Sequence, residues 1–128
     1  MPQYVVFAVD DDENAWARAS DETRNETYAA DERFGKLLEE RGGRIVGGAD
    51  LSHSRHARVL RQDGAGAALV TEGPSAETAE QISGFFIVEC DDLDTVVEAA
   101  RLMLEGHSRL EIRPPRSSSS LPNAWSAA

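Results

Sequence analysis

Two strand-like runs carry apolar side chains on both of their faces, and this feature limits the possible folds more than any other. The runs are residues 4–9 and 84–90, and both are rich in the aromatic and β-branched residues that favour strands. Because successive side chains of a strand point to opposite faces, Val5 opposes Val6 and Phe85 opposes Phe86. We therefore expect a sheet whose two faces are both buried.

The segments around these runs predict two main helices, a hairpin and two further strands. The helices are expected over residues 21–41, capped by Asp21, and over residues 91–105, where Leu93, Val96, Val97, Ala100 and Leu104 form one apolar stripe. Strands are expected at 44–51 and 110–113, and a hairpin pairs 57–61 with 67–71 around a Gly-rich turn. The order strand, helix, strand, hairpin, strand, helix, strand indicates an α+β fold.

The two helices can cover only one face of this sheet, since right-handed crossovers normally place both helices on the same side. The other apolar face then needs a second cover. A second copy of the chain is the simplest one, so we predict a homodimer that forms through the open sheet face.

Composition excludes several classes of protein. With 128 residues, the chain is long enough for one domain with a core of its own. A formal net charge of −10 argues against nucleic acid or an anionic membrane surface as the partner. Cys90 is the single cysteine, which excludes an internal disulfide and a Cys-based zinc site, and a buried apolar role is expected for it. With no basic leader and no apolar run long enough to span a membrane, a cytoplasmic protein is expected.

Several spaced motifs resemble those of the YCII-related (DGPF-type) family. An apolar strand with an acidic loop and Ala-Trp covers residues 4–16, a helix end with a Gly-Gly strand covers 37–51, and Glu-Gly-Pro-Ser at 72–75 stands where the family has Asp-Gly-Pro-Phe. The resemblance extends over about residues 4–113. It implies a ferredoxin-like sheet with two main helices on one face, assembled as a dimeric α/β barrel with a ligand cleft between sheet and helices. Residues 1–113 would form this domain, and the Ser/Pro-rich residues 114–128 a flexible tail.

The resemblance also carries functional expectations. A His–Asp pair has been proposed as the acid/base group of some members, and the DGPF branch often occurs beside extracytoplasmic-function sigma factors. This chain departs from the motif at two positions, where Glu72 replaces the Asp and Ser75 replaces the Phe.

Glu72 is the leading candidate for chemistry because it lies at a Gly73-Pro74 corner beside the sheet. Desolvation at a partly buried corner favours the neutral form of a carboxyl group, which suits a general base. The alternative is that Glu72 accepts backbone N–H bonds around the turn and only shapes the loop.

The other predicted site residues lie around this corner. His53 and His56 are candidate proton carriers, although two solvated loop histidines are the simpler interpretation. Arg58 is a candidate for binding a carboxylate or enolate, or else a surface arginine. Ligand binding is further assigned to Gly48, Gly73 and Trp16, while His107 is expected to place a favourable charge at a helix C-terminus. No metal site or cofactor is expected.

Two functions follow from these residues. The first is the binding of a small organic molecule in a sheet–helix cleft, with cofactor-free acid/base chemistry by Glu72. The second is a non-catalytic partner or sensor role linked to transcription regulation by a sigma factor. The occurrence of the family beside sigma factors and the substituted Glu-Gly-Pro-Ser motif support the second function, in which the dimer surface and the Ser-rich tail would act. A purely structural role is the third alternative.

Overall fold

The computed structural model describes residues 1–76 and 80–116. Most of the predicted tail, residues 117–128, therefore lies outside the described residues, as do motif residues 77–79. The elements are β1 (Gln3–Asp10), α1 (Glu13–Arg18), α2 (Asp21–Glu40), β2 (Arg44–Asp50), the 3₁₀ turn η1 (Ser54–His56), β3 (Arg58–Gln62), β4 (Ala68–Glu72), β5 (Gln81–Glu89), α3 (Leu93–Ala100), the 3₁₀ turn η2 (Arg101–Glu105) and β6 (Arg109–Arg113).

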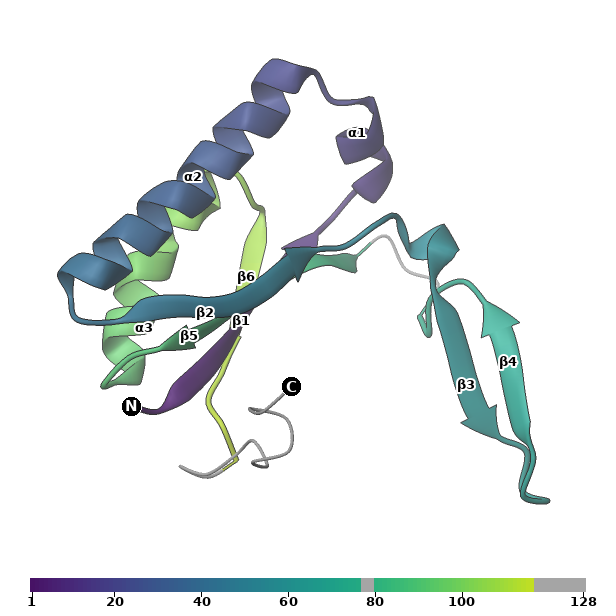
Figure 1. The fold of residues 1–128 in the computed structure, drawn as a ribbon. Coiled ribbons are helices and arrows are strands. Elements are labelled where there is room, and N and C mark those ends of the chain that lie inside the picture. The colour runs from purple at the N-terminus through teal and green to yellow at the C-terminus, as the bar shows by residue number, and fades with distance from the viewer. Residues whose placement is uncertain (77–79, 117–128) are drawn as a thin grey trace.

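A four-stranded sheet in the order β2-β5-β1-β6 forms the centre of the fold, and every neighbouring pair is antiparallel. The helices α2 and α3 lie on one face of this sheet (Figure 1). The α+β class and the order of the main elements are as the sequence predicted. The strand order and the two helices are consistent with a ferredoxin-like fold.

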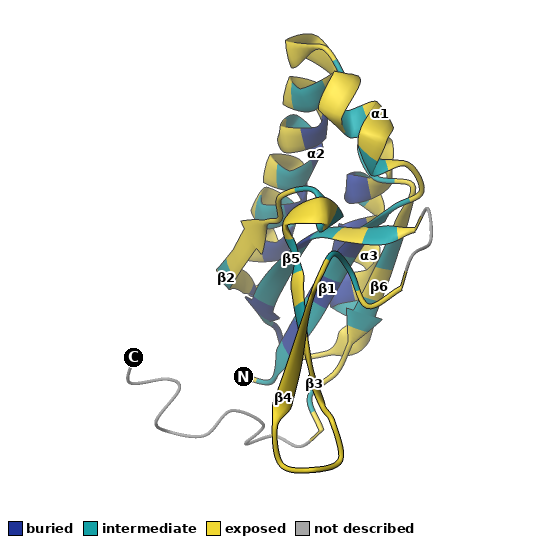
Figure 2. Ribbon diagram, turned by 90° about the vertical axis from the view of Figure 1, so that its right-hand side faces the viewer, coloured by how far each residue is buried: buried dark blue, intermediate teal, exposed yellow. Residues whose placement is uncertain are grey.

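The core lies between this sheet and the two helices. Val6 of β1 and Val88 of β5 are fully buried against Phe34 of α2 and Val96 of α3. Figure 2 shows buried residues along these elements and exposed residues on the outer sides of the helices. Cys90 is 1% exposed within the same cluster, as expected for a small apolar residue.

The predicted apolar stripe of the second helix was wrong at three positions. Leu93, Val97 and Leu104 are exposed, whereas Ala99 and Met103 join Val96 and Ala100 in the core. The helix tightens into the 3₁₀ turn η2 after Ala100. A 3₁₀ turn places residue i+3 above residue i, so Met103 rather than Leu104 faces the sheet.

The N-terminal cap of α2 also differs from the prediction. The cap is Ser20, whose side-chain oxygen accepts a hydrogen bond from the backbone N–H of Thr23 at 3.1 Å. Asp21 is instead the first residue of the helix, where its charge favours the helix dipole.

The open face of the sheet carries an apolar centre. Val5 lies opposite Ile87 and Phe7 opposite Phe85 in the β1–β5 register, and all four are half-buried in the single chain. These side chains alternate with the buried ones of the same strands, so they face away from α2 and α3.

The hairpin β3–β4 forms a separate two-stranded sheet. It projects away from the main sheet and from the helices (Figure 1). Leu60 is 67% exposed and Val70 is 61% exposed, and the two are cross-strand partners.

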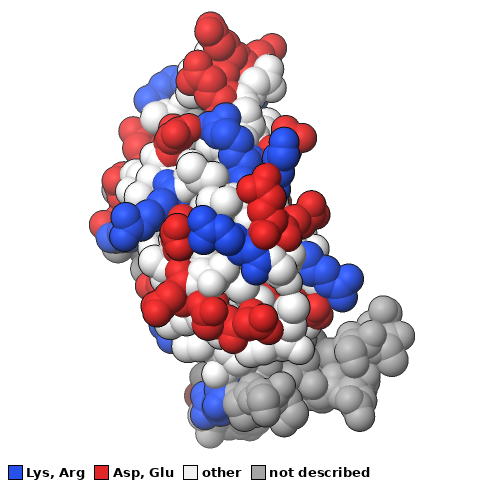
Figure 3. Space-filling view, turned by 90° about the vertical axis from the view of Figure 1, so that its left-hand side faces the viewer, with Lys and Arg blue, Asp and Glu red and all other residues white. Residues whose placement is uncertain are grey.

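One face of the molecule carries many charged side chains. Figure 3 shows acidic and basic side chains interspersed over one face of the molecule. Within residues 1–76 and 80–116, no helix combines the length and the apolar character that crossing a membrane requires.

Candidate functional site

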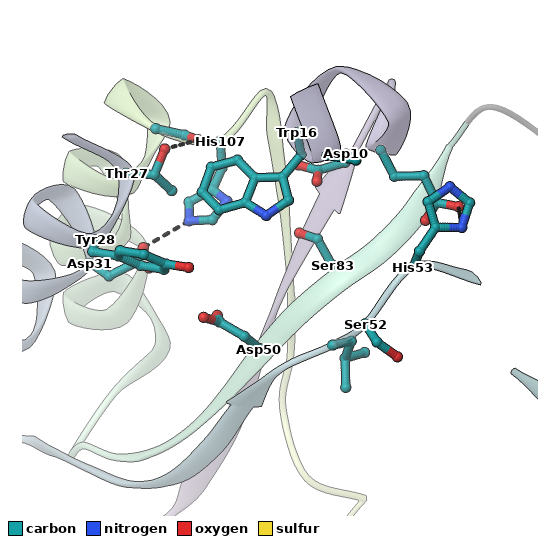
Figure 4. A pocket seen from close by; sticks show the side chains of 14 residues that line it. Asp10, Trp16, Thr27, Tyr28, Asp31, Asp50, Ser52, His53, Ser83 and His107 are labelled. Atoms are coloured by element: carbon teal, nitrogen blue, oxygen red, sulfur yellow. Dashed lines mark hydrogen bonds and ion pairs between the residues drawn. The ribbon is translucent and has the colours of Figure 1, made fainter. Parts of the chain in front are cut away.

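A pocket opens at one end of the main sheet, where β1 and β2 finish and β5 begins. It has a volume of about 200 Å³ and is bounded by α1 and α2 on the other side. In Figure 4, Asp10, Asp31, Asp50 and Trp16 surround the same space. Each comes from a different element, so the fold itself brings these groups together.

A His–Asp pair lies in the wall of this pocket. His107 Nε2 is 2.7 Å from Asp31 Oδ1, and the two side chains are only 10% and 14% exposed (Figure 4). A carboxylate accepts hydrogen bonds, so Nε2 carries the proton of this bond. The second ring nitrogen of His107, Nδ1, is buried and has no hydrogen-bond partner among the described residues.

The segment that carries His107 is held tightly against α2. A Cβ added at Gly106 would lie 2.7 Å from Thr27 Cα, so only glycine allows this approach. The Gly106 carbonyl accepts a hydrogen bond from Thr27 Oγ1 at 3.3 Å, and the His107 N–H donates to Met103 O at 2.9 Å. These contacts bring His107 to the level of Asp31, one turn further along the helix.

Asp10, the last residue of β1, adds a carboxyl group in a shielded position. Burial raises its pKa, and the nearby charges of Glu13 and Asp11 act in the same direction. His107 and the hydroxyl of Ser83 oppose this shift without cancelling it. Asp10 is therefore easier to protonate than an ordinary aspartate, which suits a group that exchanges protons with a ligand.

Asp50 ends β2 at the same end of the sheet and lines the pocket. Among the described residues, its side chain has neither an ion pair nor a hydrogen-bond partner, and Figure 4 shows it directed into the space beside Tyr28. It is a carboxylate that a ligand can use directly.

His53 lies at the far side of the pocket and has polar neighbours at both ring nitrogens. Nε2 is 2.8 Å from Asn14 Oδ1, while Nδ1 is 3.1 Å from the Arg55 N–H and 3.2 Å from Glu13 Oε1. Nδ1 accepts the hydrogen bond of the Arg55 N–H, so Nε2 carries the ring proton and donates it to Asn14 Oδ1.

Two aromatic rings complete the wall. The rings of Trp16 in α1 and Tyr28 in α2 meet edge to face with their centroids 5.9 Å apart. The Arg24 guanidinium lies 5.6 Å from the centre of the Trp16 ring and donates to the carbonyl oxygens of Trp16 and Ala17. These contacts fix the short helix α1 against α2.

The structure brings only two of the predicted site residues, Trp16 and His53, into this pocket. Glu72 ends β4 in the projecting hairpin, where its side chain is 82% exposed and lies 3.8 Å from the Arg58 guanidinium. The premise of a partly buried corner was therefore wrong for the single chain, because the hairpin does not fold back onto the sheet. Arg58, at 53% exposed, lies in the same hairpin and outside the pocket.

The remaining predicted residues also lie elsewhere. Gly48 permits a close approach, but to β5: a Cβ there would lie 2.3 Å from Phe85 O. The Gly73 N–H donates to Ala57 O at 2.9 Å and closes the base of the hairpin. His56 is exposed on η1. Within the described part of the chain, no group of three or more His, Cys, Asp or Glu is arranged to hold a metal ion.

Topology offers a signal for the residues that sequence reasoning missed. β1 and β2 are both antiparallel to β5, so they run in the same direction and end at the same end of the sheet. β6 is antiparallel to β1 and begins there. Asp10 and Asp50 end their strands and His107 precedes β6, so the strand order of the sheet is enough to bring the three together.

Comparison with known proteins agrees with the motifs in the sequence. A family model described as the YCII-related domain matches residues 3–103. The chain is also 32% identical, over 116 residues, to an uncharacterized protein of Rhizobium meliloti (strain 1021), and the match covers 87% of this chain and 90% of that protein.

Proposed function

The chain belongs to the YCII-related family, and from this premise we propose that it binds a small organic molecule in the pocket at the sheet end and transfers protons there without a cofactor. The observation that carries the proposal is the His107–Asp31 pair in the pocket wall. A His–Asp pair is the acid/base group that the family resemblance implies for some members.

In this proposal, Asp31 is the positioning residue and His107 the proton acceptor. The carboxylate holds the proton on Nε2, which leaves the lone pair of Nδ1 free to receive a proton from the ligand. Nδ1 is buried, so a neighbouring side chain must shift when the ligand binds. Asp10, whose pKa is raised, supplies the second proton-exchanging group. The reaction class is proton abstraction from a carbonyl or aromatic compound.

A thermal-shift screen against small phenols, lactones and keto acids tests this function, because ligand binding raises the apparent stability whatever the chemistry. Any compound that raises the melting temperature is then assayed with three variants, His107→Gln, Asp31→Asn and Glu72→Gln. We expect the first two to fold but to lose most of the ligand-induced shift. Glu72→Gln should retain it, since Glu72 lies outside the pocket.

If Glu72→Gln lost the ligand-induced shift and the other two variants kept it, the catalytic role would belong to Glu72. That role requires a second copy of the chain to cover the hairpin, since the Glu72 side chain is exposed in a single chain. Loss of the shift in Glu72→Gln alone would support it and would contradict the assignment to His107.

The proposal includes a homodimer that forms through the open sheet face and completes a dimeric α/β barrel. Its support is the apolar centre formed by Val5, Phe7, Phe85 and Ile87. Association would bury these side chains as the helices bury the other face. A cytoplasmic location remains part of the same proposal.

A partner or sensor role linked to a sigma factor is the second candidate function. The observation in its favour is the projecting hairpin, which exposes Leu60, Leu69 and Val70. Exposed apolar clusters of this kind mark interaction sites. Failure of every compound in the screen to stabilise the protein would favour this role over catalysis.

A further inference from the structure

The polar groups that line the pocket are mostly hydrogen-bond acceptors. Four carboxylates line it, from Asp10, Glu13, Asp31 and Asp50, and no lysine or arginine is present among its described lining residues. Like charges repel at short range, so a ligand with a carboxylate or phosphate would enter this space at a disadvantage. A ligand that donates hydrogen bonds and carries positive charge would be favoured.

Not all of these acceptors are already engaged. Asp31 binds His107, and Glu13 accepts hydrogen bonds from the backbone and the hydroxyl of Ser54. Neither Asp10 nor Asp50 forms an ion pair among the described residues, although the Ser83 hydroxyl hydrogen-bonds to Asp10.

An independent observation points to a missing donor. The side chain of His107 is nine-tenths buried, yet its Nδ1 has no partner among the described residues. A buried polar atom without a partner is unfavourable and is uncommon in native proteins. An N–H or O–H group of a bound molecule would satisfy it.

The aromatic side of the pocket fits the same kind of ligand. A cation is attracted to the faces of Trp and Tyr rings, and the Arg24 guanidinium already lies 5.6 Å from the Trp16 centroid. Trp16 and Tyr28 also supply apolar surface for the body of a ligand. The volume of about 200 Å³ leaves room for a small ring with a short chain.

We infer that the pocket selects small organic amines, bound as ammonium ions by Asp50 and Asp10 with their apolar body against Trp16 and Tyr28. This inference rests on the proposed function and adds the class of ligand to it. The ammonium group donates to these two carboxylates, neither of which is in an ion pair, and the remainder of the ligand lies toward the His107–Asp31 pair.

Three probes of nearly equal shape but different charge test the inference. They are tyramine, 4-ethylphenol and 3-(4-hydroxyphenyl)propionate, which are cationic, neutral and anionic at pH 7.5. Binding is measured by isothermal titration calorimetry and by thermal shift at low salt, where partly exposed charges are least screened. We expect tyramine to bind at least about tenfold more tightly than 4-ethylphenol, the effect of one charge-assisted hydrogen bond, and the propionate to bind most weakly.

Matched variants test which carboxylates bind the ammonium group. Asp50→Asn and Asp10→Asn should each weaken tyramine binding by about tenfold and leave 4-ethylphenol unchanged, because only the charge is removed. Asp94→Asn, on α3 and outside the pocket, is the control and should bind tyramine as the wild type does. Asp50 is exposed, so its variant is expected to fold even if Asp10→Asn does not.

The outcomes separate the inference from the proposed function. Equal binding of the cationic and neutral probes, or tighter binding of the propionate, would overturn the selection for amines and leave the ligand pocket itself intact. Absence of binding by all three probes, together with no stabilising compound in the wider screen, would count against both. Tyramine binding that Asp50→Asn and Asp10→Asn leave unchanged would place the amine elsewhere and refute the inference.

Discussion

Gly48 lies where β2 and β5 come closest, with a φ of +143° that side chains rarely adopt. A Cβ at this position would lie 2.3 Å from Phe85 O and 3.0 Å from Phe86 Cα. Both atoms belong to the backbone of a central strand, so neither can move without shifting the sheet. Gly47, one residue earlier, has only ordinary contacts with the Ile87 side chain.

These neighbouring glycines give a matched pair of substitutions. We expect Gly48→Ala to destabilise the protein by about 3 kcal/mol or more, through backbone strain and a clash. Gly47→Ala should change stability by less than about 1 kcal/mol, because its conformation suits alanine. Urea unfolding followed by circular dichroism measures both. Equal stability of the two variants would contradict the close approach at Gly48.

At the scale of the elements, Ser20 fixes where α2 begins. Its hydroxyl satisfies the Thr23 N–H, one of the backbone groups that the helix leaves without an internal partner. We expect Ser20→Ala to lower stability by about 1 kcal/mol, as measured by the midpoint of chemical unfolding. Ser20→Asp should keep most of the stability, since aspartate caps equally well. An unchanged midpoint in Ser20→Ala would show that the cap is dispensable.

The elements also show how far sequence reasoning reaches. Apolar patterning predicted the two central strands and the long helix, because burial imposes that pattern directly, whereas the hairpin, whose strands are mostly exposed, was predicted from its Gly-rich turn. It did not predict that Met103 rather than Leu104 is buried after α3, since nothing local in the sequence signals that the helix tightens after Ala100. It also could not reveal that the hairpin projects, because the direction of a hairpin depends on contacts at its base.

The pocket was only partly predictable for a related reason. Trp16 and His53 were chosen from local motifs, and both line it. The contact between His107 and Asp31 joins residues 76 positions apart, and it depends on the approach of Gly106 to α2. Glu72 was favoured because a Gly-Pro corner suggested burial, but burial is set by the packing of the whole chain.

At the scale of the whole molecule, the apolar open face of the sheet predicts that the chain forms a homodimer. We expect the wild-type chain, of 13.9 kDa, to sediment as a dimer at micromolar concentration. Ile87→Lys should produce a monomer, because it introduces a charge at the centre of the apolar face. Val97→Lys, a matched change on the exposed side of α3, should leave the dimer intact. A wild-type monomer at this concentration would contradict the dimeric barrel.

The separation of the pocket from the core has a consequence for how such a chain can change. The buried apolar cluster fills the space between the sheet and the helices, whereas the pocket takes its polar groups from strand ends, from α1, from the middle of α2 and from the segment after β2. Under the proposed function, substituting Asp50 or His53 would change the preferred ligand without removing a side chain from that cluster. We therefore expect such variants to keep the fold of the parent chain while their ligand specificity changes.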